Sequence, residues 1–312
     1  MEKKFNNLKT ISNKIKKIFV IDFNSVISHI NWIKNNRVNK HDFKAYPAKV
    51  ICFDFSRCRF LKPYHISALA CLIHEYSEKN FKIQLINIPE QIEIYLNKIN
   101  FKQFCNKFSR NNFPDPIDTT LPLWLIDATG INLYPKEAQK YFENNYLQGK
   151  DLFILSNTLA ELMNNVFDHS FSKIPGYTFT QFTSKNNQII TSLCDFGKGI
   201  PKNVNDFLKN RGEECLENDK ALRKALETKF STETKPHNRG FGLETISSNI
   251  KSIKGKILII SNDAFYCLYE NGEIKSKVLN VNFPGTLIVI TINTLNLNAK
   301  EEELNDELSL ID

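Results

Sequence analysis

Three segments of the chain carry side chains that could bind a phosphorylated ligand and act on it. They are Glu161-Leu-Met-Asn-Asn165, Asp195-Phe-Gly-Lys-Gly199-Ile-Pro201 and Arg239-Gly-Phe-Gly242-Leu243. The first supplies an acid and an amide, the second an aspartate followed by glycines, and the third another glycine pair. Together they predict a nucleotide pocket, which implies a ligand, a metal ion and a reaction.

The first segment lies in a predicted amphipathic helix over residues 151–167. Its apolar residues recur at intervals of three and four, and so share one face; they are Leu152, Leu155, Leu159, Leu162 and Val166. The opposite face carries short amides and acids, where a solvated helix typically carries Lys and Glu. Glu161 and Asn165 are about one turn apart, and their oxygens suit Mg²⁺ and its waters. A polar seam facing a neighbouring loop would explain the same stripe.

The second segment follows a predicted strand, Gln188–Asp195, where the chain turns into glycines. Gly197 and Gly199 would permit positive φ and close approach of a ligand. A buried Asp195 could accept the exocyclic amino group of adenine and would oppose the carbonyl oxygen of guanine. Leaving such an acceptor unpaired costs roughly 1–3 kcal/mol, so burial of Asp195 predicts adenine selectivity. A tight turn without a ligand would produce the same pattern.

The third segment opens a predicted helix that has Leu243, Ile246, Ile250 and Ile253 as its apolar residues and Gly255 as its C-terminal cap. A glycine-rich helix start presents unpaired backbone N–H groups and the positive end of the helix dipole, which favour phosphate. The preceding stretch, 201–238, is long and rich in Lys and Arg. It is predicted to be a partly helical lid over a polyanionic ligand, although a solvated loop would carry the same charges.

In this order and spacing, the segments resemble the GHKL, or Bergerat-fold, ATPases, a superfamily that includes gyrase B subunits, heat-shock chaperones, histidine kinases and MutL proteins. The resemblance covers residues 151–292, close to half of the chain. The first segment stands where that family has its N box, and the other two stand at its first and second glycine boxes. Pro284-Gly285-Thr286 and the strand after it resemble the terminal Gly-Thr element.

The resemblance implies Mg²⁺ and ATP as cofactors. It implies that Asn165 holds magnesium, that Asp195 binds adenine and that Glu161 is the general base for water. Thr286 would reach the adenine side, directly or through water. The implied nucleotide-binding residues are Asn165, Asp168, Asp195, Gly197, Lys198, Gly199, Ile200, Arg239, Gly240, Phe241, Gly242, Leu243 and Thr286.

The N-terminal part is predicted to be a second unit in which strands and helices alternate. The predicted strands are 18–23, 49–55 and 82–88, and the predicted helices are 25–34, 63–78 and 89–98. Residues 50–104 resemble a degenerate STAS domain, the fold of anti-sigma-factor antagonists, on the basis of Cys52-Phe-Asp-Phe-Ser56 and Gln84-Leu-Ile-Asn-Ile-Pro89. The family's phosphorylated serine precedes a helix, where this chain has Lys62-Pro-Tyr-His65. Because that hydroxyl is missing, the resemblance implies docking to a protein partner or homodimerisation.

Composition and charge narrow the class of protein. The 312 residues predict about two domains, and the 24 Phe can fill two cores. No apolar run approaches the length of about 20 residues that crosses a bilayer, and no apolar signal core follows the start, so a cytoplasmic location without membrane contact is expected. The seven scattered cysteines are predicted to be reduced core thiols. The basic start lacks interleaved aromatics and a DNA-reading motif, so nucleic acid is not favoured as a partner.

The predicted fold class is α/β, an α+β sandwich in which a GHKL ATP-binding domain follows a smaller STAS-like α/β domain. The predicted division is a regulatory or dimerisation domain at 1–105, a linker and arm at 106–150, the ATP-binding domain at 151–296 and an acidic tail at 297–312. The predicted function is an ATPase that acts as a nucleotide-dependent switch through its STAS-like domain. Two alternatives are a serine kinase of the anti-sigma type, acting on a separate STAS partner, and a scaffold that binds ATP without hydrolysing it.

Overall fold

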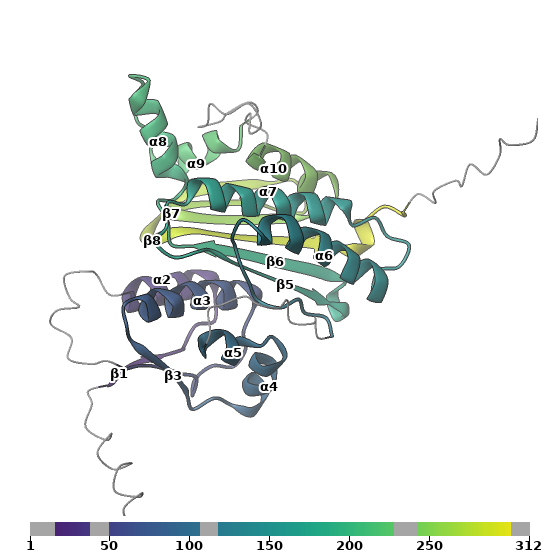
Figure 1. Ribbon diagram of the computed structural model, residues 1–312. Coiled ribbons are helices and arrows are strands. Elements are labelled where there is room, and N and C mark those ends of the chain that lie inside the picture. The colour runs from purple at the N-terminus through teal and green to yellow at the C-terminus, as the bar shows by residue number, and fades with distance from the viewer. Residues whose placement is uncertain (1–15, 38–49, 107–117, 228–241, 301–312) are drawn as a thin grey trace, which may run out of the picture.

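The computed structural model describes residues 16–37, 50–106, 118–227 and 242–300. Over these residues the protein is a mixed α/β structure with two sheets and helices packed on them (Figure 1). The mixed class expected from the sequence is therefore confirmed. In these ranges no helix combines the length and the apolar character that a bilayer crossing requires. The basic start and most of the acidic tail lie outside the described residues.

The N-terminal unit contains a three-stranded parallel sheet with the order β1-β2-β3. Parallel neighbours need crossover connections, and a helix lies in each connection. The elements are β1 Lys16–Val20, α2 Val26–Asn36, β2 Val50–Asp54, α3 Pro63–Glu78, β3 Lys82–Ile86, α4 Glu90–Lys98 and α5 Phe101–Asn106. The predicted alternation of strands and helices is confirmed for the first six elements, and α5 adds a short helix that was not predicted.

The C-terminal unit contains a five-stranded antiparallel sheet with the order β4-β5-β6-β8-β7. Its elements are β4 Trp124–Leu125, α6 Gly130–Asn145, α7 Phe153–His169, β5 Tyr177–Thr183, β6 Gln188–Asp195, α8 Ile200–Asn210, α9 Asn218–Ala225, α10 Gly242–Ser252, β7 Lys256–Leu268 and β8 Ile274–Asn293. The central strand β6 has the predicted bounds. A turn at Asn271-Gly272 joins β7 to β8, with Gly272 at φ +83°.

The stretch predicted as a linker and arm contributes directly to this sheet. Thr120 forms a bridge with Gln181, and β4 pairs with the start of β5. Helix α6 then packs against α7. The described part of this stretch, 118–150, therefore belongs structurally to the C-terminal unit.

Helices lie on both faces of the large sheet (Figure 1). Helices α6, α7 and α10 lie along one face, whereas α2 and α3 lie between the two sheets and contact the other face. Helix α3 is consequently buried along nearly its whole length. Such burial around the whole helix is expected because α3 packs against a sheet on each side.

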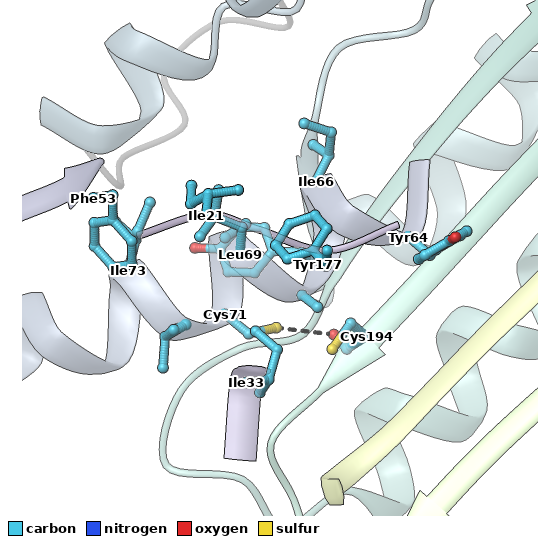
Figure 2. Close-up of a cluster of buried hydrophobic side chains, with 14 of the residues drawn as sticks. Ile21, Ile33, Phe53, Tyr64, Ile66, Leu69, Cys71, Ile73, Tyr177 and Cys194 are labelled. Atoms are coloured by element: carbon cyan, nitrogen blue, oxygen red, sulfur yellow. Dashed lines mark hydrogen bonds between the residues drawn. The ribbon is translucent and has the colours of Figure 1, made fainter. Parts of the chain in front are cut away.

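One hydrophobic cluster runs through both units. Figure 2 shows Ile66, Leu69 and Ile73 of α3 in the same cluster as Tyr177 of β5 and Cys194 of β6. Polar contacts fix the register of this packing. The Cys71 thiol donates to the Cys194 carbonyl oxygen at 3.2 Å, and His74 Nδ1 lies 2.7 Å from the Tyr177 hydroxyl. The two units thus share a continuous core.

Two buried histidines meet inside the N-terminal unit. His29 of α2 and His65 of α3 are fully buried, with ring centroids 4.8 Å apart. His65 Nδ1 accepts the backbone N–H of Lys62 at 3.0 Å and so caps the start of α3. Burial lowers the pKa of His29 to about 3 and that of His65 to about 2, with the neighbouring His29 and Lys62 charges adding to the effect on His65. Both rings are therefore neutral in the folded protein at neutral pH.

The neutral histidine pair predicts a loss of stability in mild acid. The unfolded chain takes up protons on these residues below pH 6.5 whereas the folded chain does not, so the free energy of unfolding falls as pH falls. At pH 5 the loss should be about 2 kcal/mol for each histidine. Urea unfolding at pH 7 and pH 5 should therefore show a smaller loss in His29→Leu than in the wild type. Equal losses in the two proteins would contradict the argument.

Candidate functional site

Helix α7 contacts both glycine-rich segments on the α7–α10 side of the large sheet. A Cβ added to Gly242, at the start of α10, would lie 3.0 Å from Asn165 Nδ2. One turn further, the Lys198 N–H donates to the Ser170 carbonyl oxygen at 2.6 Å. The helix that carries the first predicted segment therefore contacts the second segment through Ser170, and Asn165 itself lies beside the described end of the third.

The third predicted segment is described only in part. Gly242 and Leu243 form the first turn of α10, whereas Arg239, Gly240 and Phe241 lie outside the described residues. Beside this turn, the buried Asn165 Nδ2 has no hydrogen-bond partner among the described residues. A buried amide normally finds partners. The Asn165 amide therefore has hydrogen-bonding capacity left for a ligand at the helix start.

Asp195 ends β6 as a buried carboxyl group, with only 2% of the residue exposed. It stands opposite Thr286 of β8 in the strand register. Its Oδ1 accepts the Gly197 N–H at 2.7 Å, and among the described residues no partner is found on Oδ2. Burial raises the pKa of Asp195 to about 7, against the opposing effect of the Gly197 hydrogen bond. Such a carboxyl gains most from a ligand that donates an N–H group to it.

The turn after Asp195 leaves no room for larger residues at its glycines. A Cβ on Gly197 would lie 2.0 Å from the Ser170 carbonyl oxygen, and one on Gly285 would lie 2.2 Å from the Asp195 carbonyl oxygen. Gly199 has φ +86° and also faces the Asn262 side chain. The backbone of α7, the turn and β8 therefore meet at van der Waals distance, which fixes the position of Asp195.

Two residues that the sequence analysis did not select, Ser261 and Asn262, position the same turn. Ser261 Oγ accepts the Ile200 N–H at 2.8 Å and lies 2.9 Å from Thr286 Oγ1. Asn262 Nδ2 donates to the Lys198 carbonyl oxygen at 3.2 Å. Both residues are buried at a register irregularity in β7. The run of three polar residues Ser261-Asn-Asp263, within a mostly apolar strand, was the available signal.

Glu161 and Asp168 of the predicted site lie on α7, and Lys198 lies in the turn after Asp195. Glu161 is half-buried on α7, and desolvation raises its pKa. Asp168 lies near the C-terminal end of α7 and is partly buried. The Lys198 ammonium pairs with Asp206 of α8 and lies 5.6 Å from the ring centroid of Phe171. Helix α7 thus carries two further carboxylates, and the turn after Asp195 carries one cation, Lys198.

No family model matches this sequence, and no curated protein matches it. Within the described ranges, no three His, Cys, Asp or Glu side chains are grouped so as to hold a metal ion.

Proposed function

We propose that this chain binds Mg-ATP and is a GHKL-type ATPase that acts as a nucleotide-dependent regulatory switch. The observation that carries the proposal is the buried Asp195 carboxyl at the end of β6, opposite Thr286 and held at a glycine turn. A carboxyl in that environment is costly to bury without a partner. An adenine amino group would supply the missing donor.

Adenine selectivity follows from the same geometry. The Gly197 N–H occupies Oδ1 of Asp195, and adenine would donate to Oδ2. Guanine would present a carbonyl oxygen at that place and leave the carboxylate facing another acceptor, at a cost of roughly 1–3 kcal/mol. The Thr286 hydroxyl, hydrogen-bonded to Ser261 across the ladder from Asp195, would contact the base directly or through water.

The start of α10 and the neighbouring Asn165 would bind the phosphates and the metal ion. The first N–H groups of any α-helix have no partner within the helix, and α10, which is 11 residues long, begins at Gly242 with the positive end of its dipole. Asn165 would hold Mg²⁺ through its amide oxygen, and its unpartnered Nδ2 would be a donor for a phosphate oxygen. The metal would neutralise charge on the phosphates. Glu161, one turn before Asn165, would accept the proton of the attacking water, and the raised pKa of its carboxyl makes it a stronger base than an exposed one.

The regulatory part of the proposal rests on the shared core. Helix α3 contacts β5 and β6, the strands that lead to and carry Asp195. A nucleotide that favours one arrangement of the site would therefore bias the packing of α3. The N-terminal unit would present that state to a protein partner.

Calorimetric titration with Mg-ATP and Mg-GTP tests the proposal. We expect Mg-ATP to bind at least about tenfold more tightly than Mg-GTP, because only adenine satisfies Asp195. Asn165→Ala should weaken the binding that depends on Mg²⁺, whereas Asn157→Ala, two turns earlier on α7, should not. Equal affinity for both nucleotides, or no binding of either, would overturn the proposal.

A further inference from the structure

The residues on either side of Asp195 belong to the opposite face of the sheet. Successive side chains of a strand alternate between faces, and both Cys194 and Phe196 are part of the core shared with the N-terminal unit. Phe196 is buried and packs edge to face on Phe283, with ring centroids 5.9 Å apart. The turn that carries Asp195 is thus anchored from behind by an aromatic ring.

Arg37 connects that ring to helices α2 and α3 of the N-terminal unit. It caps the C-terminus of α2, and its guanidinium carbon lies 4.8 Å from the centroid of the Phe196 ring. Its Nε and Nη2 donate to the two carboxylate oxygens of Glu75 in α3, at 2.6 and 2.8 Å. Such a two-point pair fixes the plane of the guanidinium group. Glu75, Arg37 and Phe196 therefore form a stack, the Glu75–Arg37–Phe196 stack, that runs from α3 to the glycine turn.

The turn cannot absorb a displacement of Phe196 locally. The Phe196 Cα lies 2.8 Å from the position that a Cβ on Gly285 would occupy, and Gly197 is in similarly close contact with Ser170. Close-packed interiors transmit such shifts to their neighbours. A movement of the Phe196 ring therefore moves the backbone on one or both sides of it, and Asp195 is directly attached.

We propose that Arg37 is a positioning residue, and that the Glu75–Arg37–Phe196 stack lets the N-terminal unit set the adenine affinity of the site. This inference rests on the proposed function and specifies its regulation. The coupling is reciprocal, so bound nucleotide should also stabilise α2 and α3. A stack with a merely structural role would change the unfolding temperature and leave the affinity unchanged.

The test uses the full chain and three variants. Arg37→Gln removes the cation from the ring, Phe196→Leu removes the ring, and the double variant removes both. Lys79→Gln is the matched control. Lys79 also pairs with Glu75, at 3.2 Å, but the cation that lies over the Phe196 ring is Arg37. Mg-ATP affinity is measured by calorimetry, and hydrogen exchange of α2 is followed with and without Mg-ATP. Thermal unfolding without nucleotide shows which variants fold.

We expect Arg37→Gln and Phe196→Leu each to weaken Mg-ATP binding about threefold to tenfold. The double variant should bind Mg-ATP no more weakly than the weaker-binding of the two single variants, because both substitutions remove the same contact between Arg37 and Phe196. Mg-ATP should slow exchange in α2 of the wild type and of Lys79→Gln, and less so in the other variants. If Arg37→Gln does not fold, Phe196→Leu carries the same comparison.

Two results would overturn the inference, and they differ from failure of the proposed function. Wild-type affinity in folded Arg37→Gln and Phe196→Leu would show that the stack does not set adenine binding. Additive losses in the double variant would show two independent effects. A wild-type protein that binds no Mg-ATP would instead overturn the proposed function itself.

Discussion

Asp195→Asn is expected to weaken Mg-ATP binding about a hundredfold without destabilising the free protein at pH 8. The asparagine keeps an oxygen for the Gly197 N–H, but its amide hydrogens would oppose the adenine amino group. The pKa of Asp195 is raised to about 7, so the folded protein binds this proton more tightly than the unfolded chain. Stability therefore falls as pH rises from about 4 to about 7, by roughly 4 kcal/mol at most. The uncharged amide of Asp195→Asn does not ionise, so the variant avoids this loss of stability at pH 8.

Thermal unfolding with and without Mg-ATP, at pH 5 and pH 8, checks both parts of this expectation. The unfolding temperature of the free variant should equal or exceed that of the wild type at pH 8, and the difference should shrink at pH 5. The shift caused by Mg-ATP should be lost. Asp118→Asn, which changes an exposed aspartate, should behave as the wild type does. A folded Asp195→Asn protein with unchanged affinity would contradict the assigned role.

Periodicity predicted the elements whose burial pattern is regular. The five apolar residues chosen from their spacing, Leu152 just before α7 and four within it, are all buried, because a single stripe faces the core. Strand β6 was predicted with its observed bounds, since its residues are β-branched and apolar and a turn precedes it. These local patterns were enough to find the strand end at which Asp195 lies.

Glycine positions were predicted more accurately than the reasons for them. Gly255 follows α10 as expected, yet Lys254 takes the left-handed conformation, at φ +48°. The Gly255 N–H bonds to the Ile250 carbonyl oxygen at 2.8 Å, and a Cβ on Gly255 would lie 2.7 Å from the Ile250 side chain. Gly197 is likewise needed for close contact with Ser170. Such contacts join residues distant in sequence, which a local pattern does not contain.

Long-range packing also explains what the sequence analysis did not find. Ser261 and Asn262 lie within β7, which continues to Leu268 across a register irregularity. Ser261 Oγ and Asn262 Nδ2 form hydrogen bonds with the glycine turn, some 60 residues earlier. Strand β5 was not predicted, and its role depends on pairing with β4 and β6. The burial of α3 between two sheets is a property of the assembled units.

Glu161→Gln is expected to lower ATP turnover about a hundredfold to ten-thousandfold while preserving Mg-ATP affinity within about threefold. The amide has nearly the shape of the carboxylate but cannot accept the proton of the attacking water. In the wild type, turnover should fall on acidification through the pKa of Glu161, which burial raises above its ordinary value. Turnover by the variant should lack that acid limb. Phosphate release at several pH values measures both effects.

The same experiment separates the switch from the two alternatives. With ATP labelled on the γ-phosphate, a hydrolytic switch releases free label, whereas a serine kinase transfers label to a STAS partner supplied in the mixture. Because both reactions need a proton acceptor near the nucleophile, Glu161→Gln should suppress either one. A scaffold that never turns ATP over would show no label released or transferred in the wild type, together with undiminished binding. Unchanged turnover in Glu161→Gln would remove Glu161 from the chemistry and leave the role of Asp195 in binding to be judged on its own variant.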